Sequence, residues 1–184
     1  MRVVGGKYRG RTLAAPKSDA IRPTSDRLRE SLFNVLAHGY GNACEGARVL
    51  DLFAGTGALA IEALSRGAIY AAMVDQSAEA RGLIRANVDA LGLSGVTGLL
   101  KRDATKLGPL APFERFSLAF LDPPYRKGLA ELCLDSLAGG GWLTADALVV
   151  VEEAADVAVA TPAAFSLVEK REAGDTQLLF LRPA

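Results

Sequence analysis

The stretch VLDLFAGTGALAIEAL, residues 49–64, joins a short apolar run to a helical pattern through a turn with two glycines. Its first half has the length and apolar character of a buried strand, which we predict over residues 47–53. Its second half repeats alanine, leucine and isoleucine at helical spacing up to Gly67, a residue suited to a left-handed helix end. At Gly55 and Gly57 no side chain blocks the backbone, so the turn can approach a ligand closely.

The rest of the chain after residue 45 continues this alternation of short apolar runs and helical patterns. Such alternation is typical of βαβ units and predicts an α/β fold, Rossmann-like, with a mostly parallel sheet. Ligands of such sheets bind beyond the carboxyl ends of the strands, where several of these runs end in aspartate. We predict further strands over residues 70–75, 96–103, 116–122 and 147–153, helices over residues 78–91 and 129–140, and a C-terminal hairpin over residues 165–183.

The segment before the sheet predicts two more elements. The first fifteen residues have the pattern of a β-hairpin, and residues 22–39 have the pattern of an amphipathic helix. Thr24 or Ser25 is the expected N-cap of that helix, because a hydroxyl there accepts a hydrogen bond from a free backbone N–H.

The composition is that of a globular protein, with 184 residues, half of them apolar and 23% charged. That length fits one domain. No apolar run is long enough for a membrane span or a signal peptide, so we expect a cytoplasmic protein without a membrane partner. Cys44 and Cys133 lack metal-site spacing and are expected to be buried thiols, and we assign no metal site and no role to His38.

The net charge of zero hides an asymmetry along the chain. Residues 1–29 hold eight basic and two acidic side chains, a net charge of +6, and the remainder therefore carries −6. A basic arm on an acidic body indicates a polyanionic partner, because lysine and arginine release counterions from phosphates. The alternative is a solvated charged face. The candidate RNA-binding residues are Lys7, Arg9, Arg11, Arg22 and Arg27.

Acidic residues at the strand ends favour a cationic ligand. The GTGALA turn satisfies a loose dinucleotide pattern, but Asp51, four residues before Gly55, would repel a pyrophosphate. S-adenosylmethionine instead carries a sulfonium and an amino group, which acids attract. Asp75 has the spacing of a ribose-binding acid, and Asp103 is placed to accept from an adenine amine. The alternative for Asp51 is a buried residue that caps the turn.

The stretch LDPPY, residues 121–125, ends a predicted strand with a set of acceptors. Pro123 and Pro124 have no N–H, so Asp122 and the neighbouring carbonyl can accept both hydrogens of an amine on a planar ring. Tyr125 offers a flat face on which an extruded base can stack. We interpret these four residues as catalytic, against the alternative of a rigid turn that only ends a strand.

These motifs resemble class I S-adenosylmethionine-dependent methyltransferases that modify exocyclic amines of nucleobases. The segments RVVGGKYRGRTL, RPTSDRLRESLFNVL, NVDALGL and LDPPY, in this order, are most similar to the RsmD family. The resemblance implies a seven-stranded sheet with the last strand antiparallel, and methylation of the N2 amine of guanine-966 in 16S ribosomal RNA. It also implies cofactor contacts from Asp51, Phe53, Gly55, Gly57, Asp75, Gln76, Asp103, Ala104 and Asp122.

The resemblance also implies how the chain is organised. We expect an RNA-binding hairpin and helix over residues 1–40, a methyltransferase domain over residues 41–184, and a monomer that acts on 16S ribosomal RNA within the small subunit. The alternatives are an adenine-N6 methyltransferase of DNA or RNA, and a non-catalytic RNA-binding assembly factor. A nicotinamide oxidoreductase would leave LDPPY unexplained.

Overall fold

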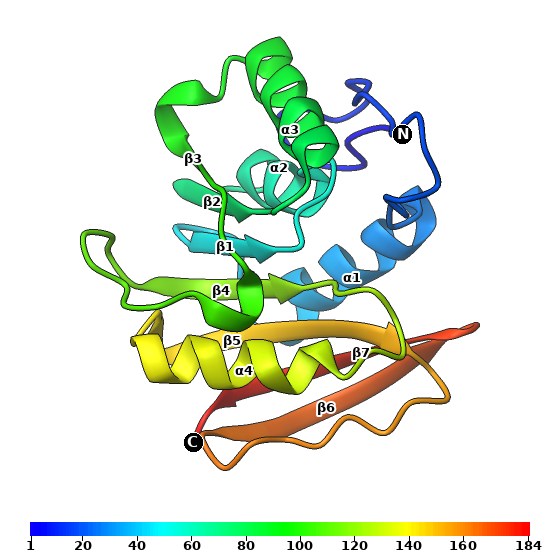
Figure 1. The fold of residues 1–184 in the computed structure, drawn as a ribbon. Coiled ribbons are helices and arrows are strands. Elements are labelled where there is room, and N and C mark those ends of the chain that lie inside the picture. The colour runs from blue at the N-terminus through cyan, green and yellow to red at the C-terminus, as the bar shows by residue number, and fades with distance from the viewer.

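The computed structural model describes residues 1–184 and contains one seven-stranded sheet with helices on both faces (Figure 1). The strand order is β3-β2-β1-β4-β5-β7-β6. Strands β1 to β5 run parallel, and β7 is antiparallel to both β5 and β6, which confirms the predicted sheet. The elements are α1 (Asp26–Gly39), β1 (Arg48–Leu52), α2 (Ala58–Ser65), β2 (Tyr70–Val74), α3 (Ala78–Leu91), η1 (Ser94–Val96), β3 (Thr97–Leu100), η2 (Ala104–Lys106), β4 (Phe116–Leu121), α4 (Leu129–Gly140), β5 (Leu143–Ala154), β6 (Phe165–Ala173) and β7 (Thr176–Pro183).

Alternate residues of the strands divide between two cores. Val49 of β1 packs in the cluster that contains the apolar side chains of α1, α2 and α3. Leu50 and Leu52 point the other way and pack with α4, which lies on the opposite face of the sheet (Figure 1). Because both faces are covered, the central strands are mostly apolar.

Most predicted elements are confirmed, with two shifts at strand ends. β3 stops at Leu100, so residues 101–103 leave the strand before the short helix η2. β5 begins at Leu143, four residues before the predicted start, because Leu143 pairs with Phe116 ahead of a register shift. Ser25 is the N-cap of α1, and its hydroxyl accepts from the backbone N–H of Leu28.

The predicted N-terminal hairpin is wrong. Residues 1–15 form only one isolated antiparallel bridge, between Arg2 and Thr12, and no pair of strands. Three backbone hydrogen bonds join residues 1–3 with residues 10–13, but the middle of the segment donates to α2: Lys7 to the carbonyl of Ser65 and Tyr8 to its hydroxyl. Gly6 has a φ of 76°, and a Cβ there would lie 1.9 Å from the Ser65 carbonyl oxygen, so only glycine permits this contact.

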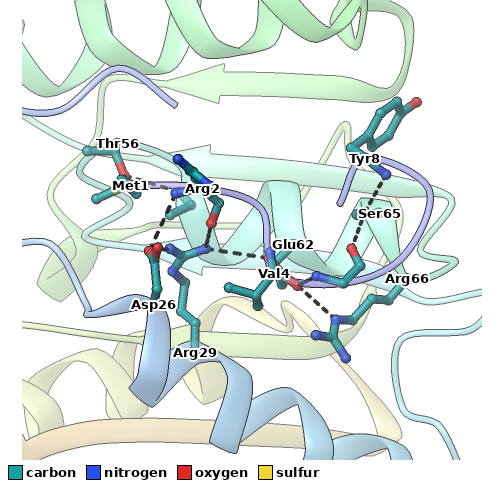
Figure 2. Close-up of polar contacts among 12 residues, drawn as sticks. Met1, Arg2, Val4, Tyr8, Asp26, Arg29, Thr56, Glu62, Ser65 and Arg66 are labelled. Atoms are coloured by element: carbon teal, nitrogen blue, oxygen red, sulfur yellow. Dashed lines mark hydrogen bonds and ion pairs between the residues drawn. The ribbon is translucent and has the colours of Figure 1, made fainter. Parts of the chain in front are cut away.

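The buried carboxylate of Glu62 joins the N-terminal segment, α1 and α2 (Figure 2). It accepts hydrogen bonds from the backbone N–H groups of Val4, at 3.0 Å, and Gly5, at 2.9 Å. It also pairs with the guanidinium groups of Arg29, at 3.4 Å, and Arg66, at 2.9 Å. The side chains of Glu62 and Arg29 are both fully buried. Four donors therefore compensate the burial of one carboxylate.

Arg29 belongs to the core and not to the basic surface. Its guanidinium also donates to the carbonyl of Arg2 and pairs with Asp26. Val3, Leu13, Leu32 and other apolar residues of the first forty share a core cluster with the sheet. The division of the chain at residue 40 stays a prediction.

Two further observations concern the chain as a whole. Cys44 and Cys133 are buried and unpaired. None of the helices has the length and apolar character needed to cross a membrane.

Replacing Glu62 with alanine should destabilise the protein strongly. The substitution leaves the buried guanidinium of Arg29 and two backbone N–H groups without their acceptor, and we expect a loss of about 3 to 5 kcal/mol of unfolding free energy. Urea unfolding measures this loss. Glu114→Ala is the control, because the Glu114 side chain is 83% exposed and forms only a long pair with Arg48, at 3.8 Å, and its effect should stay within about 0.5 kcal/mol. Equal losses in the two variants would contradict the role of Glu62.

Candidate active site

A cavity of about 950 Å³ lies beyond the carboxyl ends of the central strands. The register of the strands determines which residues line this cavity. Leu52 pairs with Val74 and with Leu121, and Leu121 pairs with Val151. The residues that follow these strand ends therefore lie together at the carboxyl edge of the sheet. The predicted site residues that line the cavity are Asp51, Phe53, Gly55, Asp75, Asp122, Pro123, Pro124 and Tyr125.

The turn after β1 has backbone geometry that few residues accept. Phe53 has a φ of 60°, which is strained for a residue with a side chain. Gly57, at the N-cap of α2, has a φ of 80°, and a Cβ there would lie 3.0 Å from the Met73 sulfur. Gly57 therefore serves the packing of the turn against β2, whereas Gly55 lines the cavity.

Asp51 has a buried oxygen without a partner. Its Oδ2 accepts from the backbone N–H of Ala60 at 3.2 Å, but no donor reaches its Oδ1. Burial, and secondarily the charge of Asp75, raises the pKa of Asp51 to about 7. A cationic donor in the cavity would satisfy the free oxygen and stabilise the ionised carboxylate.

Asp75 is held in place by the turn that it faces. Its Oδ2 accepts from the backbone N–H of Gly55 at 3.0 Å, and its Oδ1 accepts from that of Ser77 at 2.9 Å. Each carboxylate oxygen keeps a second lone pair, so Asp75 can still accept from a hydroxyl of a ligand.

Four of the predicted cofactor-binding residues do not line the cavity: Gly57, Gln76, Asp103 and Ala104. Asp103 is the N-cap of η2 and accepts from the backbone and hydroxyl of Thr105, and these hydrogen bonds lower its pKa. The contacts of these four residues with a cofactor stay predictions.

Asp122 shares a hydroxyl with a second carboxylate. The Thr24 Oγ1 lies 3.1 Å from Asp122 Oδ2 and 3.3 Å from Glu152 Oε2. Burial raises the pKa of Asp122 well above its usual range, and the neighbouring charge of Glu152 raises it further. Burial also raises the pKa of Glu152.

Tyr125 is fixed at its hydroxyl end. The hydroxyl donates to Glu152 Oε1 and lies 3.0 Å from Thr176 Oγ1. Arg22 lies over the ring, with its guanidinium carbon 5.3 Å from the ring centre. The ring is half-buried and lines the cavity together with Arg22.

Sequence reasoning missed three residues of this site: Thr24 in its role as a bridge, Glu152 and Thr176. Thr24 was considered only as a helix cap, a role that Ser25 fills. Glu152 carried a signal, because an acid at the end of the apolar run ALVVVEE is costly to bury without a function or a partner. Thr176 carried none, since the pairing of β7 with β5, which sets Thr176 opposite Ala154, brings it to Tyr125.

The candidate RNA-binding residues fall into two groups. Arg22 and Arg27 line the mouth of the cavity, and both are exposed. Lys7, Arg9 and Arg11 are exposed on the N-terminal segment, where Arg11 donates to the Ala90 carbonyl.

Replacing Asp51 with asparagine should remove a cost that the ligand-free protein carries. An acid with a pKa near ~3.9 when unfolded and about 7 when folded lowers stability as pH rises through this window. We expect Asp51→Asn to be more stable than wild type by about 2 to 4 kcal/mol above pH ~7, and this gain should disappear near pH ~4. Urea unfolding across this range tests it, with the exposed Asp135→Asn as control. A gain that does not change with pH would contradict the assignment.

Comparison with known proteins agrees with this geometry. Residues 1–182 match the family described as Conserved hypothetical protein 95. The chain is 36% identical over 175 residues to Ribosomal RNA small subunit methyltransferase D of Escherichia coli (strain K12), a match that covers 95% of this chain and 85% of the relative. It is 32% identical over 179 residues to the protein of the same name from Haemophilus influenzae, covering 95% and 89%.

Solved structures give the same result. The Escherichia coli protein yhhF superposes with a TM-score of 0.83 at 34% identity and covers 100% of this chain and 97% of its own. A hypothetical protein of Thermus thermophilus has a TM-score of 0.77 at 34% identity, covering 98% of each chain. The sequence match over nearly the whole length and the shared fold leave one conclusion: the chain belongs to the Conserved hypothetical protein 95 family, the RsmD family that its motifs resemble.

Proposed function

We propose that this protein transfers a methyl group from S-adenosylmethionine to the N2 amine of guanine-966 in 16S ribosomal RNA of the small ribosomal subunit. The observation that carries the proposal is one cavity that holds both an unsatisfied acid, Asp51, and the acceptor set at Asp122. Membership of the RsmD family, whose relatives are small-subunit ribosomal RNA methyltransferases by name, supports the substrate.

The residues present fit S-adenosylmethionine. When bound, this cofactor supplies a methyl group on a positively charged sulfur. Asp51 has a free buried oxygen for a cationic amino group, and Asp75 has lone pairs for ribose hydroxyls. Gly55, which has no side chain, lets the backbone approach the ligand.

Asp122, Pro123 and Tyr125 suit a nucleobase amine. The Asp122 carboxylate and the Pro123 carbonyl accept its two hydrogens, which directs the nitrogen lone pair into the cavity. The free face of Tyr125 stacks on the extruded base, a contact worth about 1 to 3 kcal/mol. Positioning of this kind supplies most of the rate, because a sulfonium is already a good leaving group and the amine needs no strong base before it attacks.

Basic side chains extend from the cavity along the N-terminal segment. Arg22 and Arg27 lie at the cavity mouth, and Lys7 and Arg9 are exposed farther along. Phosphates of an RNA that places its base on Tyr125 would contact this row of cations, so residues 1–40 bind RNA in the proposed complex.

Replacing Asp122 with alanine should abolish methyl transfer and leave cofactor binding intact. We expect turnover to fall at least about 100-fold, because the amine loses the acceptor that orients it. Labelled methyl transfer onto small subunits from a strain that lacks the modification, followed by nucleoside analysis, measures turnover. Calorimetry with S-adenosylmethionine measures binding.

Each other result identifies an alternative. Unchanged methylation by Asp122→Ala would remove this carboxylate from the mechanism. N6-methyladenosine as the only product would assign the protein to the adenine methyltransferases. A wild-type protein that binds RNA but not S-adenosylmethionine would be an assembly factor.

Replacing Lys7 and Arg9 together with alanine should weaken RNA binding and reduce its salt dependence. Each lost phosphate contact lowers the slope of log affinity against log salt by about 1, so we expect a slope smaller by about 1 to 2. Filter binding of small subunits at several salt concentrations measures it. Lys170→Ala with Arg171→Ala removes the same charge from the edge strand β6 and should leave the slope unchanged. Equal slopes for both double variants would refute the role of the N-terminal segment.

A further inference from the structure

Two carboxylates from different strands meet at a single hydroxyl. Asp122 follows β4 and Glu152 lies in β5, and Thr24 Oγ1 is within hydrogen-bonding distance of both, at 3.1 Å and 3.3 Å. A hydroxyl has only one hydrogen to donate, so it cannot satisfy both carboxylates at the same time. A shared proton between the acids would resolve this shortage.

The donors around the two acids are unequally divided. The Tyr125 hydroxyl donates to Glu152, and Thr176 Oγ1 lies 3.0 Å from the same hydroxyl. Of the side chains nearby, only Thr24 donates to Asp122. The hydrogen bonds therefore favour the charge on Glu152 and the proton on Asp122.

Burial makes two negative charges unfavourable here. Glu152 is 8% exposed, and like charges in such a site titrate as a coupled pair. Burial raises the pKa of both acids, and the charge of Glu152 contributes to the shift of Asp122. The titratable and charged groups that face the pair are Asp51 from β1, Tyr125 from the turn after β4, and Arg22 from the segment before α1. Arg27 of α1 lines the same cavity.

We infer that Glu152 is a positioning residue that acts through Asp122: the two carboxylates work as one unit, and Glu152 makes Asp122 the base for the proton that the methylated amine releases. This inference rests on the proposed function. The amine nitrogen forms a bond to the methyl carbon as the carbon–sulfur bond breaks, and sulfur keeps the electron pair. The reacting form is the one in which the pair has lost its shared proton, so that Asp122 is ionised. The nitrogen, now positively charged, gives one proton to Asp122, which passes it to water after the product leaves.

Glu152→Gln tests this role, since it removes the charge and keeps the shape. Without the neighbouring charge, Asp122 loses its proton more easily, so the acidic limb of the kcat profile should move to lower pH by about one unit. The plateau of kcat should fall, because Asp122 becomes a weaker base, while KM for the small subunit stays unchanged. Glu153→Gln is the matched control: Glu153 is the next residue and is also buried, but it accepts from the backbone of Arg126 and Ala154.

A second measurement does not depend on activity. Carbon NMR of the ligand-free protein, labelled at the aspartate and glutamate carboxyl carbons, should show Asp122 and Glu152 titrating together in wild type. Asp122 should titrate at lower pH in Glu152→Gln and be unchanged in Glu153→Gln. Independent titration of the two acids in wild type, or an Asp122 curve that Glu152→Gln does not shift, would overturn the inference. If Glu152→Gln does not fold, the wild-type titration decides alone. Absence of methyl transfer by wild type would refute the proposed function without changing this titration.

Discussion

Parallel pairing of β1 with its neighbours β2 and β4 is the constraint on which the site depends. Each parallel strand must end at the same edge of the sheet, so Phe53, Asp75 and Asp122 come together although they are far apart in the sequence. The pairing of Leu121 with Val151 extends the row to Glu152 on β5. A shift of one residue in any of these registers would turn the acid at that strand end away from the cavity. The apolar residues that fix the register therefore also determine the positions of the site residues.

The N-terminal segment completes the cavity from outside the sheet. Glu62 holds Val4, Gly5 and Arg29 against α2, which fixes the position at which α1 begins. Thr24 lies just before that start and reaches Asp122 and Glu152. The buried ion pair of Glu62 and Arg29 thus helps to position a hydroxyl in the active site. Residues 22–27 consequently carry both the basic side chains of Arg22 and Arg27 and the hydroxyl of Thr24 that contacts the two acids.

Sequence patterns among neighbouring residues predicted most of the fold and the residues that line the cavity after β1, β2 and β4. Strand and helix periods, the glycine turn and LDPPY depend on neighbouring residues, and the structure confirms the elements that they predict. The N-terminal hairpin was wrong because its two halves share only one bridge and a few backbone hydrogen bonds, while the residues between them bind to Ser65 of α2. Glu152 and Thr176 were missed because their roles arise from the pairing of β5 with β4 and with β7, and no local pattern encodes the register between strands that are distant in the sequence.

The buried acids explain why such a site is unstable when empty and selective when filled. Asp51, Asp122 and Glu152 all have raised pKa values because burial disfavours their ionised forms. A cation near Asp51 relieves part of this cost, and an amine that donates to Asp122 relieves another part. A ligand that has neither a positive charge nor an N–H donor relieves neither. Burying these carboxylates without enough donors costs free energy, and a ligand recovers part of it only if it brings a positive charge or an amine to the strand ends. The site therefore distinguishes a positively charged methyl donor and an amine acceptor from other molecules of similar shape.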